Sequence, residues 1–325
     1  MDIAAVGNTL YADSYIDLLA LDISNPLNVT IIKRVENALP DRIFTNGYYA
    51  EPGKGVVTEW LEKMVTEKIS NDCNSNSGYW GRGPWLEGDA FTANSAGTAS
   101  PKSSVTAPGI GGSMARFTIA NNVLYVVDQS SLRMFSITGE LTSLGTTSVG
   151  RNIETIFPYN NHLFIGSTNG MFIYNISNPT SPIYVSTYIH GTACDPVVVD
   201  DNYAYITLRS GTPCNTTFNQ LEVVNIQNLS SPSLSHTVQM TNPHGLGKDG
   251  NVLFVCDGTA GLKVMDATDP ASIPATPVVT FSTIQATDVI PFNNLLLLIG
   301  EDGLYQYDYS NVQNISLLSR IPVEN

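Results

Sequence analysis

The chain has 325 residues, with 26 glycines and 18 prolines spread along it. Because these residues end or interrupt helices, their frequency excludes a helical bundle or a helical solenoid. The hydrophobic content of 42% is ample for a core, and no run of 18 apolar residues suggests a membrane-spanning helix. The formal net charge is −14, and no basic cluster offers the positive surface that binding to a nucleic-acid backbone needs.

Six segments share one pattern, in which a turn rich in Asn, Asp or Gly leads into a short apolar strand and then into an alternating strand. The alternating strand carries Asp, Asn or Ser at positions 22, 136, 175, 225, 266 and 308, which gives spacings of 114, 39, 50, 41 and 42. A period near 40 with four short strands in each unit is typical of β-propeller blades. The sequence therefore predicts an all-β fold, a single β-propeller domain over 1–325 with six recognisable four-stranded blades.

The repeats also end alike. Residues 261–270 read Gly-Leu-Lys-Val-Met-Asp-Ala-Thr-Asp-Pro, and residues 18–26 end in Asp-Ile-Ser-Asn-Pro. The polar side chains cap the turn backbone, and proline cannot continue a central strand. This pattern resembles the LVIVD-repeat proteins, a bacterial envelope group of β-propellers that are often lipoproteins. The resemblance covers roughly residues 1–40 and 111–325, and it implies an extracytoplasmic place in the bacterial cell envelope, as a lipoprotein or a secreted protein.

The start of the chain carries no recognisable signal peptide. One interpretation is a cytoplasmic protein, and the other is a chain whose leader is missing. The family resemblance favours the second interpretation. A seventh blade would then precede Met1.

The long first spacing predicts an insertion over 39–112, between the first and second blades. Residues 56–69 place apolar side chains on one stripe and charged ones mostly opposite, so we expect a helix there. A loop rich in Gly, Ser and Asn follows, and it contains Trp80 and Trp85. Aromatic side chains in a loop on a rigid scaffold are candidate ligand-binding residues. The alternative is that Trp60 and Trp85 anchor the insertion to a blade edge.

Charged residues recur where the first strand of each blade begins. Counting back from the second strands gives Arg116, Glu154, Asp195, His244 and Asp288. First strands line the channel of a propeller, so these residues are expected to ring one mouth and to contact a ligand there. The three carboxylates and the imidazole are candidate ligands for Ca²⁺ or another divalent cation. The alternative is a hydrated mouth in which Arg116 balances the acids.

Two of the four cysteines are expected to form a disulfide. Cys194 precedes the first strand of the fourth blade, and Cys214 lies in its second hairpin, on the same face of the blade. A Cys194–Cys214 bridge would suit an oxidising compartment. It would also hold Arg209 near Asp195, which makes Arg209 a candidate ligand-binding residue. Reduced thiols in a cytosolic protein are the alternative.

No hydrolase, metalloprotease, P-loop or dinucleotide-binding motif occurs. We therefore expect a secreted or surface-anchored binding or interaction propeller, with a ligand or cation site at the channel mouth. Its partner would be a protein, a glycan or a small molecule. One alternative is a metal-dependent hydrolase or lyase that uses the acidic ring, and another is a structural component of the envelope.

Overall fold

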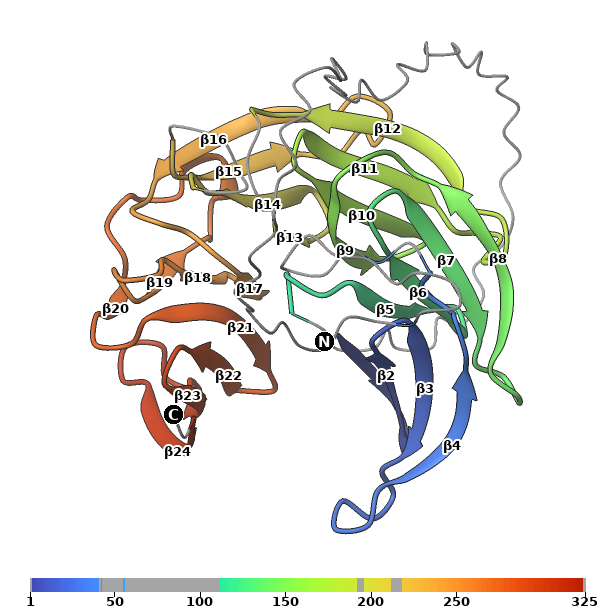
Figure 1. The fold of residues 1–325 in the computed structure, drawn as a ribbon. Helices are drawn as coiled ribbons and strands as arrows, with labels where there is room; N and C mark the ends of the chain where they lie inside the picture. The colour runs from blue at the N-terminus through green and yellow to red at the C-terminus, as the bar shows by residue number, and fades with distance from the viewer. Residues whose placement is uncertain are drawn as a thin grey trace, which may run out of the picture. The chain divides into compact units, whose positions relative to one another are not determined.

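Polar turns separate short apolar strands along the chain, and the computed structural model folds these strands into six four-stranded antiparallel sheets (Figure 1). It describes residues 2–40, 42, 55, 112–191, 196–211 and 218–323, all within one compact unit made of residues 1–56 and 105–325. Each sheet takes its four strands in sequence order, as a propeller blade does. The predicted six-bladed propeller is confirmed.

Blade 1 contains β1 (Ile3–Val6), β2 (Thr9–Ser14), β3 (Asp17–Asp22) and β4 (Thr30–Val35). Blade 2 contains β5 (Phe117–Ala120), β6 (Val123–Val127), β7 (Ser131–Ser136) and β8 (Thr142–Ser148). Blade 3 contains β9 (Ile153–Tyr159), β10 (His162–Ser167), β11 (Gly170–Asn175) and β12 (Ile183–Ile189).

Blade 4 contains β13 (Val197–Val199), β14 (Tyr203–Leu208), β15 (Gln220–Asn225) and β16 (Ser233–Gln239). Blade 5 contains β17 (Leu246–Asp249), β18 (Val252–Cys256), β19 (Leu262–Asp266) and β20 (Val279–Phe281). Blade 6 contains β21 (Ala286–Phe292), β22 (Leu295–Gly300), β23 (Gly303–Asp308) and β24 (Ser316–Pro322).

Helical structure in the described residues amounts to one 3-10 turn, η1 (Pro270–Ser272). The helix predicted over 56–69 is therefore not borne out, and those residues lie outside the described part of the chain. None of the described helices is long and apolar enough to cross a membrane.

The core of the protein lies between blades. Five apolar clusters fill the junctions between blades 1 and 2, 2 and 3, 3 and 4, 4 and 5, and 5 and 6. Tyr125 illustrates such a junction, since its ring is fully buried and its hydroxyl donates a hydrogen bond to the Pro179 carbonyl of the next blade at 2.9 Å. The first strands β1, β5, β9, β13, β17 and β21 contact one another in that order. Packing between neighbouring sheets therefore brings the starts of these strands together.

The repeated Asp or Asn at the end of the third strand closes a turn in five of the blades. Its side-chain oxygen accepts a hydrogen bond from the N–H two residues on, at 2.8–3.0 Å, in the pairs Asp22–Ser24, Asn175–Ser177, Asn225–Gln227, Asp266–Thr268 and Asp308–Ser310. Such bonds satisfy the turn backbone where the chain leaves one strand for the next. The predicted capping of these turns is confirmed.

The glycine that opens the third strand of blade 5 is required by its close contact with β20. Gly261 has φ +88°, and a Cβ atom there would lie 2.0 Å from the Phe281 carbonyl oxygen. No side chain larger than hydrogen fits without moving β20. Gly250 also has a positive φ, +52°, but no atom lies within 4 Å of the Cβ position.

We expect Gly261→Ala to lower the free energy of unfolding by roughly 2–4 kcal/mol, because the methyl group would clash with the β20 backbone. The matched change Gly250→Asn should cost less than about 1 kcal/mol, since Asn tolerates this backbone conformation in a turn. Chemical denaturation of both variants tests the prediction. Equal losses in the two variants would contradict it.

Candidate functional site

The described first strands begin where the charged residues were predicted. Arg116 immediately precedes β5, Glu154 is the second residue of β9, His244 lies two residues before β17, and Asp288 is the third residue of β21. The neighbouring first strands pack together, so these four residues occupy the same end of the channel in different blades. We call this end the mouth.

A short segment that leads into blade 2, residues 112–115, lies across the channel. The Ser113 side chain is buried, and its hydroxyl donates a hydrogen bond to Asp288 Oδ1 at 3.2 Å. The Ser113 hydroxyl oxygen also accepts a hydrogen bond from the N–H of Leu246 at 2.8 Å. Ser113, in the segment that enters blade 2, is therefore hydrogen-bonded to both blade 5 and blade 6. We call residues 112–115 the strap.

Glycines let the strap and blade 5 approach Asp288 closely. A Cβ on Gly112 would lie 2.2 Å from Asp288 Oδ2, and one on Gly245 would lie 2.0 Å from Asp288 Oδ1. The Gly245 N–H donates to the Thr287 carbonyl at 2.8 Å, which joins blade 5 to blade 6 at the same level. The carboxyl group thus sits between two backbones that carry no side chain.

Burial under the strap raises the pKa of Asp288 to about 6, although hydrogen bonds from the N–H of Val289, from Ser113 and from the N–H of Met114 act in the opposite direction. These donors engage the carboxyl group. Asp288 therefore holds the strap in place through hydrogen bonds.

His244 lies partly buried at the mouth and is held by polar contacts on several sides. Its N–H donates to the Cys256 carbonyl at 2.7 Å, and its ring Nε2 lies 3.3 Å from the amide nitrogen of Asn242. Burial and, to a lesser extent, the positive charge of Arg209 together lower the pKa of His244 to about 4, although Asp257 opposes the shift. The imidazole is therefore neutral at pH 7, next to a cationic side chain.

Asp257 fixes the turn that carries Asn242 to the imidazole. This carboxylate has no exposed surface, and it accepts the N–H of Asn242 at 2.7 Å and the N–H of Thr241 at 3.0 Å. Lys263 pairs with it at 2.5 Å. Sequence reasoning did not single out Asp257 or Lys263, because nothing in their spacing connects them with residue 244.

On the blade 1 side of the mouth, Arg42 contacts two carboxylates. It forms ion pairs with Asp13 and, at 3.4 Å, with Asp2. Arg116 contributes its backbone N–H to Asp2 Oδ1 at 3.3 Å. The balancing of Glu154, Asp195 and Asp288 by Arg116 stays a prediction, and no repeat position in the sequence marks Arg42.

Beyond the strap, the channel contains a cavity of about 200 Å³. Residues of β5, β9, β13, β17 and β21 line it, together with Gly112, Ser113 and Ala115. These strand residues follow the mouth residues in sequence, so the cavity lies on the far side of the strap. Its walls are largely apolar, and Lys248 stands at its distal end.

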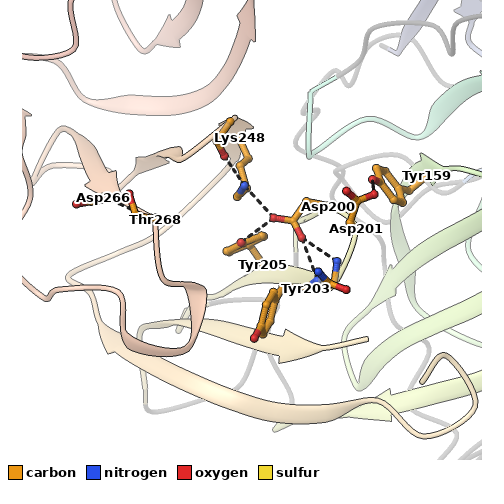
Figure 2. Close-up of polar contacts among 10 residues, drawn as sticks. Tyr159, Asp200, Asp201, Tyr203, Tyr205, Lys248, Asp266 and Thr268 are labelled. Carbon is orange, nitrogen blue, oxygen red and sulfur yellow. Dashed lines mark hydrogen bonds and ion pairs between the residues drawn. The ribbon is translucent and has the colours of Figure 1, made fainter. Parts of the chain in front are cut away.

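Lys248 also borders a larger hollow of about 510 Å³ between the hairpins of blades 3, 4 and 5. Figure 2 shows its polar contacts: Lys248 pairs with Asp200 at 2.8 Å, and the Tyr205 hydroxyl donates to the same carboxylate at 2.9 Å. Burial alone would raise the pKa of Asp200, but the bonds from Lys248 and Tyr205 outweigh it, and the pKa is lowered. The Tyr159 hydroxyl donates to Asp201 beside them. At this end of the channel, Lys248 and Asp200 pair with each other, and these contacts join blade 5 to blade 4.

Several predicted site residues lie outside the described part of the chain: Trp80, Trp85, Cys194, Asp195 and Cys214. The Cys194–Cys214 disulfide therefore stays a prediction. In the described residues, no group of three or more His, Cys, Asp or Glu side chains is arranged to hold a metal ion. Because Asp195 belonged to the expected cation site, that site also stays a prediction.

A model of the LVIVD repeat matches residues 1–37, 151–189 and 190–240, which correspond to blades 1, 3 and 4. The resemblance seen in the sequence is confirmed. The chain is a β-propeller that contains LVIVD repeats. No curated protein matches it.

Solved structures with a similar chain path include a computationally designed protein, Ika8, with 9% identity over 98% of this chain and 85% of that chain, at a TM-score of 0.49. BamB from Moraxella catarrhalis has 10% identity over 93% of this chain and 67% of its own, also at 0.49. Apo AztD from Citrobacter koseri has 10% identity over 60% of this chain and 57% of its own, at 0.47. At these identities the likeness concerns the fold alone.

The raised pKa of Asp288 predicts a pH-dependent difference between the wild type and Asp288→Asn. An acid whose pKa is raised by folding stabilises the protein fully below its unfolded value and loses that contribution as pH rises through about 6. Asparagine has no such proton to lose. The melting temperature of the variant should therefore improve relative to the wild type between pH 4.5 and pH 7.5. A constant difference across this range would contradict the prediction.

The lowered pKa of His244 acts in the reverse sense, because its stabilising contribution is complete above about pH 6.5 and is lost as pH falls through about 4. A proton NMR titration should give His244 a midpoint near 4. Arg209→Ala should raise this midpoint, since the variant removes a positive charge beside the ring. The exposed Arg151→Ala is the control and should leave it in place.

Proposed function

We propose that this LVIVD-repeat propeller is a binding or interaction module that takes a ligand at the channel mouth, beside Arg209 and His244. The observation that carries the proposal is the neutral imidazole of His244 within reach of the positive charge of Arg209, which lowers its pKa. The hydroxyl of Thr207, two residues before Arg209, donates to the His244 carbonyl at 2.5 Å, and the buried Asp257 accepts the N–H of Asn242, two residues before His244.

The chemistry of this pair favours a ligand that bears a carboxylate or another anionic oxygen. Arg209 supplies a permanent positive charge with several N–H donors. The neutral imidazole has one N–H donor and one acceptor nitrogen, and its tautomer decides which ring nitrogen takes each role. A cation at the same place would meet the repulsion of Arg209, and Asp288 already accepts several hydrogen bonds under the strap.

The strap supports a binding function at the mouth. Residues 112–115 cross the channel and bond to blades 5 and 6, so the mouth ends on a fixed polypeptide floor. A rigid floor holds binding groups in place before the ligand arrives, and this reduces the ordering cost of binding. Arg116 and Glu154 stand at the same end of the channel and belong to the proposed ligand-binding surface.

An extracytoplasmic location in the bacterial cell envelope forms part of the proposal, as does a ligand that is a protein, a glycan or a small molecule. It rests on the LVIVD repeats and on the expected Cys194–Cys214 bridge, which would need an oxidising compartment. Trp80 and Trp85, which lie outside the described residues, belong to the proposal as candidate ligand-binding aromatic side chains.

Labelled protein screened on glycan and peptide arrays tests the proposal. We expect acidic ligands to be retained, and Arg209→Ala and His244→Ala each to reduce the retained signal at least tenfold, because each variant removes a direct polar contact. Arg151→Ala, which removes an exposed charge outside the pair, is the matched control and should keep the signal. Arrays that retain no ligand would favour a structural role.

Metal analysis of protein purified without chelator separates the competing enzyme hypothesis. Stoichiometric Ca²⁺ or Zn²⁺ that is lost in His244→Ala, together with turnover of ester, lactone or sugar substrates, would favour a metal-dependent hydrolase or lyase at Glu154, Asp195, His244 and Asp288. That result would replace the binding proposal.

A further inference from the structure

Blades 1 and 6 differ from the four blades between them in the burial of their second strands. In β6, β10, β14 and β18 the residues of both faces are buried along almost the whole strand. In β2 and β22, burial alternates with partial or full exposure from one residue to the next. Each of these two strands therefore has one packed face and one open face.

The open face of blade 1 is largely apolar, with the ion pair of Arg34 and Asp17 at one end. Cross-strand pairing places Ile3, Ala5, Leu10, Ala12, Leu19, Leu21 and Ile31 on it. Ile3 is 58% exposed and Ile31 is 61% exposed. The opposite face of the same blade, with Tyr11 and Leu18, is buried in the core against blade 2.

Blade 6 presents a matching open face. Pairing of β21, β22, β23 and β24 places Ile290, Phe292, Leu295, Leu297, Ile299, Leu304 and Ile321 on it. Gln306 and Ser319 are polar members of the same face, beside Leu297. Phe292 is 44% exposed, Ile299 is 48% exposed and Ile321 is 64% exposed. The packed face of this blade, with Leu298 and Tyr305, is buried against blade 5.

No apolar cluster joins these two faces in the described part of the chain. The five clusters end with the one between blades 5 and 6, and β21 has no contact with β1 comparable to its contact with β17. The two end blades, blue and red in Figure 1, therefore each pack on a neighbouring blade on one side only in the described part of the chain. Apolar faces of this extent on a folded protein mark an interaction surface.

We infer that the open faces of blades 1 and 6 receive one further four-stranded blade that is apolar on both sides. Only an element that is apolar on both sides satisfies both faces, and each of blades 2 to 5 is such an element. The surfaces continue an established type of interface, since every described junction packs one apolar blade face on another.

A fusion supplies the missing neighbour for a direct test. A copy of residues 151–196, which contains blade 3 and its connection to the next first strand, is placed before Met1. We expect the melting temperature to rise by about 5 °C or more and the fluorescence of the apolar dye ANS to fall, because both faces become buried. An unchanged melting temperature and unchanged dye binding would overturn the inference.

Face variants show whether the gain comes from these surfaces. In the fusion, Leu19→Asn with Leu297→Asn should abolish the rise in melting temperature, whereas the exposed Thr142→Asn should keep it. In the unfused chain, the double variant should reduce ANS fluorescence while shifting the melting temperature far less. If the unfused chain binds no ANS, the faces are already covered and the inference fails.

Light scattering of the unfused chain distinguishes a second copy as the occupant. We expect a monomer, or association that the fusion abolishes. A defined dimer that persists in the fusion and is lost in Leu297→Asn would overturn the inference in favour of self-association.

Discussion

Face-to-face packing of apolar sheets is the interaction on which the rest of this molecule depends. Each junction buries side chains of two blades, and the backbone polar groups are satisfied within the sheets. The packing brings β1, β5, β9, β13, β17 and β21 beside one another. Residues that lie about 40 positions apart in the sequence thus reach one end of the channel. A change that loosens one junction would displace the groups of two adjacent blades at the mouth.

The strap shows how a segment outside the repeats acquires a fixed position inside the channel. The Ser113 hydroxyl donates to Asp288 and accepts from the Leu246 N–H, and Gly112 and Gly245 allow the backbones to come close. The cost of burying a carboxyl group appears as a raised pKa. The result divides the channel into a polar mouth and a largely apolar cavity.

The two ends of the channel use charge in different ways. At the distal end, Lys248, Tyr205 and Asp200 satisfy one another. At the mouth, a guanidinium group stands beside a neutral imidazole, and no carboxylate pairs directly with that imidazole in the described residues. This difference is the reason to place ligand binding at the mouth, since charge that is already neutralised within the protein has less to offer a ligand.

The sequence by itself determined the all-β class, the six blades, the turn-closing Asp and Asn side chains and the strand starts near Arg116, Glu154, His244 and Asp288. These features follow from local rules, because strand alternation, turn chemistry and a period near 40 are written in short stretches of chain. The tertiary structure decided the partners: Ser113 for Asp288, Arg42 for Asp13, and Arg209 beside the imidazole of His244. It also showed that blades 1 and 6 each keep an open apolar face, although Leu295–Ile299 reads like a strand buried on both sides. Such contacts join residues far apart in sequence, so they depend on how sheets pack in space, and no local pattern encodes them.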